Sequence, residues 1–319
     1  MTASILVLGA GFGGIAAATD LARLLPRGHR VTLVDAAPTF TMGLVNLQAL
    51  DGRTTGADRA RPLKALERHG LAFLQARVER VDPASRTVQT SAGALAYDRL
   101  VVALGAAVAP ERVEGLPPAA RNLYALAGAR AFHEDLARMR GGGRVLIVAH
   151  SMPFKCPPAP YEAAVLAKRF LAARGVDAEV VLATPEPHPL PVFPAETGAR
   201  LRGLVEERGV VVRNGATLAG FPTDRVAAFS DGSRVAFDAL GLVPPHVPPA
   251  GLAGLADGWL AADPATLATA HPDVWAVGDC AGVKLANGKM LPKAGVLAEA
   301  QGRVVAANLA AAARGETPA

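Results

Sequence analysis

Residues 4–14 read Ser4-Ile5-Leu6-Val7-Leu8-Gly9-Ala10-Gly11-Phe12-Gly13-Gly14, an apolar run that leads directly into a glycine loop. The apolar run predicts a buried strand, and the pattern from Ile15 to Leu25 predicts a helix that ends at Pro26-Arg27-Gly28. A second strand is expected from Arg30 to Val34, and Asp35 follows it. Strand, helix and strand make a βαβ unit, so we expect two parallel strands joined by a right-handed crossover.

The glycine loop predicts a dinucleotide-binding site. Gly9, Gly11 and Gly14 would permit a tight turn, a close approach of backbone to a pyrophosphate and close packing of the helix. The helix N-terminus would offer free N–H groups and the positive end of its dipole to the phosphates. Asp35 stands where an acid can accept a hydrogen bond from a ribose hydroxyl. A purely structural turn is the alternative, and the flanking strand, helix and acid argue against it.

The whole chain predicts an α/β fold with two Rossmann-like domains, each a three-layer structure on a parallel sheet. A chain of 319 residues with 51% hydrophobic content can bury a large core and usually forms two domains. We expect a small meander between Leu71 and Tyr97 and a linker at Pro110 to Pro118, and the proline-dense segment Pro244 to Pro249 marks a return to the first domain. The predicted domains are 1–110 with 241–319, which is discontinuous, and 111–240.

Other expected elements follow from apolar runs and periodicity. In the second domain they are a helix at 127–139, a strand at 144–149, a helix at 161–173, a strand at 178–183 and a helix at 195–208. In the first domain they are strands at 99–104 and 274–277 and a helix from about 294 to 311.

Charge and cysteine content exclude several classes of protein. The formal charge is +5, but the Arg and Lys residues are scattered, so a solvated basic surface is expected rather than a nucleic-acid site. Attraction to an anionic membrane face is the alternative. No apolar run approaches the ~20 residues that span a bilayer, and we expect a cytoplasmic protein, with peripheral contact at the inner face of the membrane left open. Two cysteines are too few for a disulfide scaffold.

Two further segments point to FAD. Residues 274–281, Val-Trp-Ala-Val-Gly-Asp-Cys-Ala, form a strand running into Gly278-Asp279 and resemble the FAD-contacting segment of flavoproteins with two dinucleotide-binding domains. Residues 99–106, Arg-Leu-Val-Val-Ala-Leu-Gly-Ala, resemble the strand between the FAD and pyridine-nucleotide domains of the same family. The resemblance implies that Asp279 hydrogen-bonds the ribityl chain. A helix N-cap is the simpler role for Asp279, and the two roles are compatible.

The second domain lacks a matching glycine loop. After its first strand the sequence reads His150-Ser151-Met152-Pro153-Phe154-Lys155-Cys156-Pro157-Pro158. Bulky side chains and prolines remove backbone donors and block a pyrophosphate. The triplet Gly141-Gly142-Gly143 precedes the strand and therefore lies at the wrong end to bind phosphates. NAD(P)H binding is not expected.

Residues 153–162, Pro-Phe-Lys-Cys-Pro-Pro-Ala-Pro-Tyr-Glu, resemble the redox-cysteine segment of flavocytochrome c sulfide dehydrogenases and sulfide:quinone oxidoreductases. The resemblance implies that sulfide reduces FAD and that Cys156 attacks or carries sulfur beside the flavin. Lys155 and the following helix N-terminus would lower the thiol pKa. An inert buried cysteine is the alternative.

Residues 291–295, Leu-Pro-Lys-Ala-Gly, resemble the segment that begins the last helix of this family beside the flavin N1 and O2 atoms. Lys293 would stabilise negative charge there, and a surface lysine at a helix start is the alternative. His150 and Glu162 could exchange protons, although a packed histidine and a first-turn glutamate that suits the helix dipole are the simpler interpretations.

The sequence departs from the family in two ways. Sulfide oxidation there generally uses two cysteines, and the partner of the one matched by Cys156 lies beyond the last FAD helix. The customary C-terminal domain, which shapes the quinone site, is expected to be absent. Cys280 is not expected to replace the partner. The resemblance places its segment by the ribityl chain, and a disulfide needs Cα atoms within about 7 Å.

We predict an FAD-dependent oxidoreductase that oxidises sulfide or a small sulfur compound and passes electrons to a quinone or protein acceptor; a homodimer stays open. The alternatives are an NAD(P)H-dependent enzyme resembling type II NADH dehydrogenases, and a non-catalytic FAD-binding sensor or assembly protein. No metal is expected. Predicted catalytic residues are Cys156 and Lys293; predicted FAD contacts are Gly9, Gly11, Phe12, Gly13, Gly14, Asp35, Ala36, Val78, Ala103, Leu104, Gly105, Gly278, Asp279 and Lys293.

Overall fold

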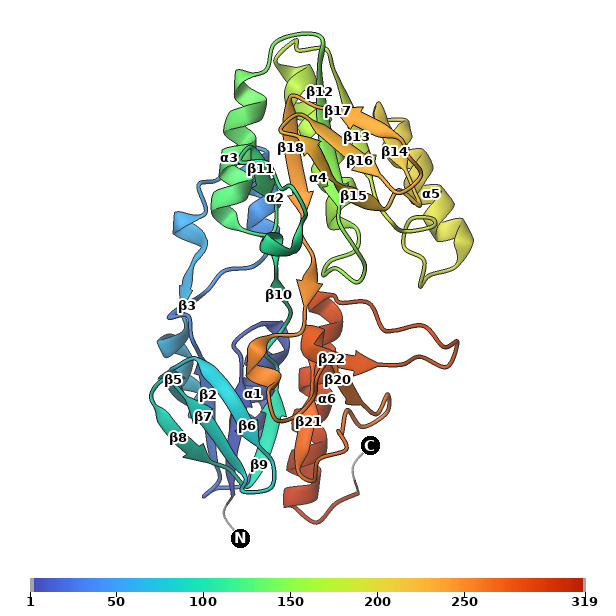
Figure 1. The fold of residues 1–319 in the computed structure, drawn as a ribbon. Coiled ribbons are helices and arrows are strands. Elements are labelled where there is room, and N and C mark those ends of the chain that lie inside the picture. The colour runs from blue at the N-terminus through green and yellow to red at the C-terminus, as the bar shows by residue number, and fades with distance from the viewer. Residues whose placement is uncertain (1–2, 318–319) are drawn as a thin grey trace. The chain divides into compact units, whose positions relative to one another are not determined.

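The computed structural model describes residues 3–317 (Figure 1). The chain divides into two compact units, each assembled from more than one segment. The first unit contains residues up to Phe40, Arg61–Ala107 and the residues from Val247 onward; the second contains Thr41–Ala60 and Val108–His246. Relative to the predicted ranges, residues 41–60 lie with the second unit, and each boundary differs by a few residues.

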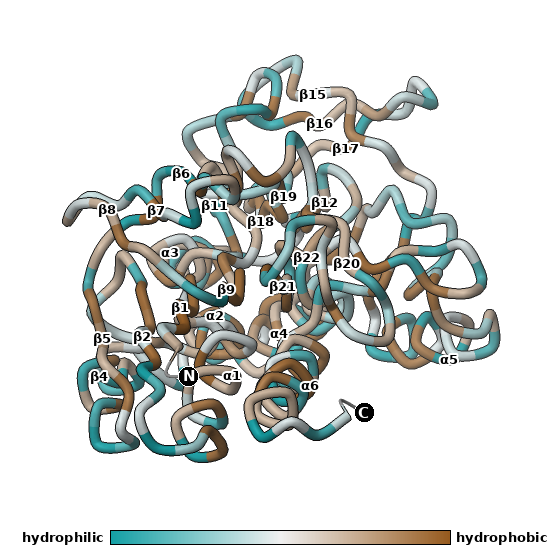
Figure 2. Tube along the Cα trace, turned by 90° about the horizontal axis from the view of Figure 1, so that it is seen from below, coloured by the Kyte–Doolittle hydropathy of each residue, from teal (hydrophilic) through white to brown (hydrophobic). Residues whose placement is uncertain are grey.

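A five-stranded parallel sheet forms the centre of the first unit. Its order is β21-β9-β1-β2-β5, with β1 pairing β2 and β9 in parallel. Apolar residues fill these strands, as expected for a parallel sheet covered on both faces, and Figure 2 shows the hydrophobic colour along β1, β9 and β21. The strands are β1 (Ser4–Leu8), β2 (Arg30–Asp35), β5 (Ala72–Gln75), β9 (Arg99–Val102) and β21 (Val274–Ala276).

Two helices of the first unit, α1 (Phe12–Leu24) and α6 (Gly295–Ala313), pack closely against each other. Glycines allow this contact: a β-carbon on Gly302 would lie 2.3 Å from the carbonyl oxygen of Gly13, and one on Gly13 would lie 2.9 Å from that of Ala298. The first and the last helix of the described chain are thereby joined.

The predicted meander of the first unit needs a correction. The meander was expected between Leu71 and Tyr97, but strand structure is interrupted at Ala76-Arg77. β5 joins the parallel sheet beside β2, and only the later residues form the antiparallel sheet β6 (Val78–Asp82), β7 (Thr87–Thr90) and β8 (Gly93–Ala96). Both pieces are short and β-rich, so composition alone could not separate them.

The second unit has three layers around the parallel sheet β11-β18-β12-β13-β14. Alternate residues of β12 and β13, such as Val145 and Val180, face helices, whereas Leu146 and Val181 face an antiparallel meander. The elements are β11 (Ala120–Asn122), α3 (Leu126–Arg138), β12 (Gly143–Ala149), α4 (Ala159–Ala173), β13 (Ala178–Ala183), α5 (Ala195–Glu206), β14 (Val210–Arg213), β15 (Leu218–Thr223), β16 (Val226–Phe229), β17 (Arg234–Ala236) and β18 (Ala239–Val243).

The segment 41–60 carries the short helix α2 (Leu44–Leu50), which packs between α3 and α4. Leu47 and Leu50 lie in the same hydrophobic cluster as those helices, and Asp51 bonds Arg169 of α4. The sequence of this segment predicts no helix, because seven residues are too few to display a clear period.

Smaller elements complete the chain. They are the strands β3 (Thr39–Phe40), β4 (Arg61–Pro62), β10 (Ala107–Val108), β19 (His246–Val247), β20 (Leu260–Ala262) and β22 (Ala281–Val283), and 3₁₀ helices at Ala57–Arg59, Leu63–His69, Pro110–Arg112, Ala250–Leu252 and Gly278–Cys280. Between residues 3 and 317, no helix is both long enough and apolar enough to cross a membrane.

Candidate functional site

The glycine loop lies between β1 and α1, where the sequence predicted it. Gly9 has a φ of +96°, and a β-carbon there would lie 2.3 Å from the carbonyl oxygen of Ala103. A β-carbon on Gly14 would lie 1.8 Å from the carbonyl oxygen of Gly9. A β-carbon on Gly11, by contrast, would meet no atom within 4 Å. The fold therefore requires Gly9 and Gly14, whereas Gly11 leaves open space in front of the helix.

That open space adjoins a helix end suited to an anion. Gly11 is the N-cap of α1; no side chain caps the helix there, and its first turn carries no acidic residue. The first N–H groups of α1 thus keep their hydrogen-bonding capacity, and the helix dipole adds positive potential. A pyrophosphate fits these donors and the absence of a β-carbon at Gly11.

Asp35 ends β2 and holds the loop in shape. Its Oδ2 accepts a hydrogen bond from the Ala10 amide at 2.6 Å, and its Oδ1 accepts one from the Ala37 amide at 2.8 Å. Each carboxylate oxygen has a second lone pair, so a ribose hydroxyl could still donate to Asp35. Ala36 beside it is exposed.

Other predicted contacts lie around the same sheet edge. Ala103, Leu104 and Gly105 follow β9, and the Ala103 amide donates to the carbonyl of Leu8 at 2.7 Å. Phe12 begins α1, and its ring packs edge-on against Phe40 with centroids 5.4 Å apart. Val78 is buried at the start of β6 rather than in the parallel sheet.

The Gly278–Asp279 turn is fastened to α6. Gly278 has a φ of +72°, and its amide donates to Oε1 of Gln301 at 2.7 Å. Cys280 behind the turn is fully buried, its thiol donates to the carbonyls of Val102 and Val277, and burial raises its pKa to about 11. Cys280 is therefore a protonated, inaccessible thiol. The sequence analysis did not single out Gln301.

Lys293 is a buried cation just before α6. Its side chain is 7% exposed, and burial lowers its pKa to about 8. The ammonium donates to the Asp279 carbonyl oxygen and lies 3.5 Å from the centre of the Trp259 ring. Lys293 lines a small cavity with Gly278, Asp279 and the first residues of α6. The alternative of a surface lysine is wrong, and Trp259 was missed because nothing in its local sequence marks it.

In the second unit, a proline-rich loop and Cys156 occupy the place between β12 and α4. Cys156 is partly exposed and has a φ of +54°, a left-handed conformation that is unfavourable for a residue with a side chain. Its carbonyl accepts the Ala159 amide at 2.9 Å at the start of α4. Within residues 3–317, neither cysteine of the chain forms a disulfide.

Aromatic side chains support this cysteine loop. The Tyr124 hydroxyl donates to the Lys155 carbonyl at 2.7 Å, and the Tyr124 ring packs edge-on against His246 with centroids 4.8 Å apart. Phe154 is buried beside Tyr124. The residue next to Cys156 is therefore held by a side chain that sequence reasoning did not single out.

In the second unit, a buried acid stands at the position that corresponds to Asp35 of the first unit. Glu186 follows β13, the second strand of the β12–α4–β13 unit, and is 2% exposed. The Tyr161 hydroxyl of α4 donates to its Oε2 at 2.6 Å. Burial raises the pKa of both groups. The charge of Glu186 raises the Tyr161 pKa further, whereas the hydrogen bond from Tyr161 opposes the rise in the Glu186 pKa. Comparing Glu186 with Asp35 could have revealed this acid, but not its tyrosine partner.

His150 and Glu162 show no arrangement for proton transfer. Burial lowers the pKa of His150, and its Nδ1 is buried without a hydrogen-bond partner. Glu162 is exposed in the first turn of α4. A packed histidine and a glutamate placed by the helix dipole describe these positions.

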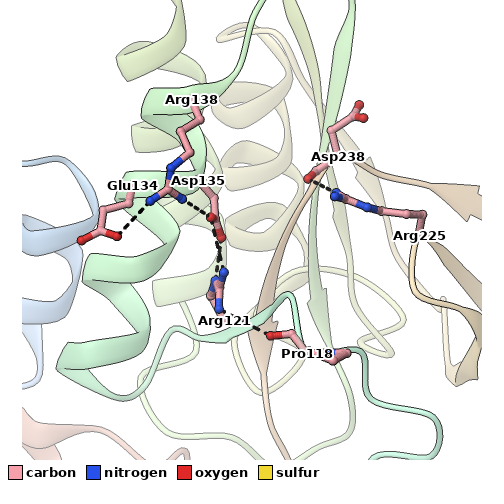
Figure 3. A network of polar contacts seen from close by, with 7 residues as sticks. All are labelled: Pro118, Arg121, Glu134, Asp135, Arg138, Arg225 and Asp238. Atoms are coloured by element: carbon pink, nitrogen blue, oxygen red, sulfur yellow. Dashed lines mark hydrogen bonds and ion pairs between the residues drawn. The ribbon is translucent and has the colours of Figure 1, made fainter.

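Two open cavities of about 850 and 530 Å³ lie at the amino end of the second sheet, beside Gly142 and Gly143. This is the end where the glycine triplet was predicted to be unsuited to phosphates. Figure 3 shows three arginines that line the smaller cavity, each in a polar contact within the protein. The pairs drawn are Arg121 with Asp135, Arg138 with Glu134 and Asp135, and Arg225 with the Asp238 carbonyl.

Comparison with known proteins supports the same fold. The family model described as Pyridine nucleotide-disulphide oxidoreductase matches residues 3–302. A sulfide-quinone reductase of Aquifex aeolicus (strain VF5) is 33% identical over 107 residues, which make up 33% of this chain. The aligned part covers 25% of that relative's length.

Solved structures resemble nearly the whole chain. The sulfide:quinone oxidoreductase of the hyperthermophilic bacterium Aquifex aeolicus has a TM-score of 0.85 at 22% identity, covering 98% of this chain and 77% of that one. A NAD-dependent persulfide reductase from A. fulgidus has a TM-score of 0.74 at 22% identity, covering 96% and 59%. The similarity at these identities is one of fold, and it includes proteins with different electron donors in their names.

Proposed function

The chain belongs to the pyridine nucleotide-disulphide oxidoreductase family, and from this membership we propose that it is an FAD-dependent enzyme that oxidises sulfide or another small sulfur compound. The observation that carries the proposal is the loop between β12 and α4. There Cys156, among prolines, stands where the corresponding loop of the first unit carries its glycines. The resemblance of that loop to sulfide-oxidising flavoproteins gives the substrate class.

FAD fits the residues of the first unit. The uncapped end of α1 and the open position at Gly11 suit its pyrophosphate, and Asp35 suits its ribose. Asp279 and Lys293 would act on the ribityl chain and the flavin edge. Bound FAD would supply an acceptor for two electrons.

Cys156 would carry the sulfur. A thiolate at Cys156 and a hydrosulfide ion would form one S–S bond, giving a cysteine persulfide anion, one proton and two electrons, for which bound FAD would supply the acceptor. A second sulfur nucleophile would then take the outer sulfur and return Cys156 to its thiolate. A quinone or a protein would reoxidise the flavin, at a peripheral membrane site or in solution.

An NAD(P)H-dependent activity is the second candidate, because the fold of the second unit also occurs in a NAD-dependent persulfide reductase. Two features oppose it in this chain. The loop after β12 offers prolines in place of amide donors, and Glu186, the acid at the position that would bind a ribose, is buried with Tyr161 hydrogen-bonded to it.

An anaerobic titration tests the proposal. Sulfide should bleach the visible absorbance of the bound flavin in the wild-type protein, and NADH should not. Cys156→Ser should slow the sulfide reaction by at least about a thousandfold, since serine is far less nucleophilic and cannot form a persulfide.

Cys280→Ser is the matched control, because Cys280 is buried and its hydroxyl replacement keeps the same carbonyl acceptors. This variant should react at nearly the wild-type rate. Bleaching by NADH alone would favour the second candidate, and FAD binding without reduction by either donor would favour a sensor or assembly role.

A further inference from the structure

The Lys293 side chain of the first unit contacts a backbone carbonyl and an aromatic ring. The ammonium of Lys293 is held by a backbone carbonyl of Asp279 and by the face of Trp259, whose ring centre lies 3.5 Å away. A carbonyl and an indole face stabilise a cation without cancelling its charge. A lysine satisfied in this way keeps positive charge for a bound anionic group.

Two ionisable groups act on Lys293 besides its burial. The charge of Asp279 raises the lysine pKa, and so does that of Cys280 where the thiol is ionised. The thiol pKa of about 11 leaves Cys280 neutral near pH 7. An aromatic face in contact with an ammonium opposes the effect of desolvation, because it attracts the charged form.

Trp259 is itself fixed by the surrounding sheet. It immediately precedes β20, which pairs in parallel with β22, and Leu260 lies opposite Ala281. A β-carbon on Gly282 would lie 3.4 Å from the Trp259 β-carbon, so Trp259 lies directly beside β22. β22 follows the Asp279–Cys280 turn, and the indole, the turn and the lysine are thus positioned together.

We propose that Trp259 is a positioning residue for Lys293: its indole face keeps the ammonium charged and in place at the cavity formed by Gly278, Asp279 and the start of α6. The anionic group that profits is the reduced flavin edge. The inference rests on the proposed FAD binding but not on the proposed sulfur substrate.

The reduction potential of bound FAD, measured against pH with a chemical reductant and reference dyes, tests this role. Reduction adds negative charge to the flavin and would raise the pKa of Lys293. Above the lysine pKa of the oxidised state, reduction would therefore take up an extra proton. In the wild-type holoprotein the potential should therefore fall more steeply with pH above about pH 8. Lys293→Met should lack this break.

Trp259→Leu should move the break to lower pH by about half to one and a half units, because the cation–π stabilisation of the ammonium is lost. Trp259→Phe, which keeps an aromatic face, should move it less. The matched control is Trp275→Phe in β21, which changes the other tryptophan of the chain and should leave the break in place.

A break that stays near pH 8 or moves upward in Trp259→Leu would overturn the proposal, as would an equal shift in Trp275→Phe. The outcome does not depend on Cys156, because no sulfide is used. A normal pH break together with no reduction by sulfide would contradict the proposed substrate and leave the role of Trp259 standing.

Discussion

Gly9 and Gly11 lie two residues apart in one loop, but a β-carbon would meet different surroundings at each. At Gly9 the β-carbon would clash with the carbonyl oxygen of Ala103, and it would add a side chain to a residue with φ of +96°. At Gly11 it would enter only open space. The two positions therefore separate what the fold requires from what a ligand requires.

We expect Gly9→Ala to lower the free energy of unfolding of the apoprotein by at least about 1–3 kcal/mol, the usual cost of a side chain in that conformation. Gly11→Ala should leave the unfolding midpoint nearly unchanged and weaken FAD binding by roughly tenfold or more, about 1.4 kcal/mol, because its methyl group would occupy the pyrophosphate space. Denaturant unfolding and a flavin titration of both variants measure this. Equal effects of the two substitutions on stability would contradict it.

Residues with local sequence signals were the predictable ones. Gly9, Gly14 and Asp35 belong to a motif with fixed spacing, and the structure gives each a backbone partner or a close contact. Trp259 and Tyr161 could not be predicted, because their partners Lys293 and Glu186 are more than 20 residues away along the chain. Such contacts follow only from the three-dimensional fold.

At the level of secondary structure, the contact between α1 and α6 depends on small residues. Gly302 faces α1 closely enough that a β-carbon would lie 2.3 Å from the Gly13 carbonyl and 3.0 Å from the Ala17 amide. Backbone atoms cannot move aside as a flexible side chain can. The two helices would have to separate to admit a methyl group.

Gly302→Ala should therefore destabilise the protein by about 1–3 kcal/mol, the typical cost of overpacking, despite the better helix propensity of alanine. Gly203→Ala is the matched control in α5, where no atom lies within 4 Å of the added β-carbon, and it should be neutral or stabilise by up to about 1 kcal/mol. Thermal unfolding of the two variants distinguishes them, and a shift in the same direction for both would rule out the packing explanation.

The sequence predicted long helices and buried strands well. The strand at 178–183 has the predicted bounds, and the helices α3 and α6 differ from prediction by a residue or two at each end. The short elements were missed. β15, β16 and β17 have six, four and three residues and show no clear period of two in their sequences, so only their packing against the second sheet identifies them.

At the scale of the whole molecule, each unit has its own hydrophobic core, and both tryptophans of the chain lie in the first unit. Tryptophan emission should therefore report the unfolding of the first unit, while far-UV circular dichroism reports both. Added FAD at a hundredfold excess over Kd should raise the free energy of unfolding of the first unit by about 2.7 kcal/mol. The tryptophan transition should therefore move to a higher denaturant concentration.

A comparison of apoprotein and FAD-loaded protein checks this expectation. The part of the circular dichroism signal that belongs to the second unit should unfold at the same denaturant concentration in both samples. Coincident transitions from both probes, shifted equally by FAD, would show instead that the two units unfold as one.

The discontinuity of the first unit also bears on synthesis of the chain. The glycine loop leaves the ribosome among the first residues, but β21 and α6, which complete its sheet and pack on α1, are made only after the second unit is finished. The second unit needs no residue beyond His246. Translation thus favours folding of the second unit before β21 and α6 can complete the sheet and the helix packing of the first.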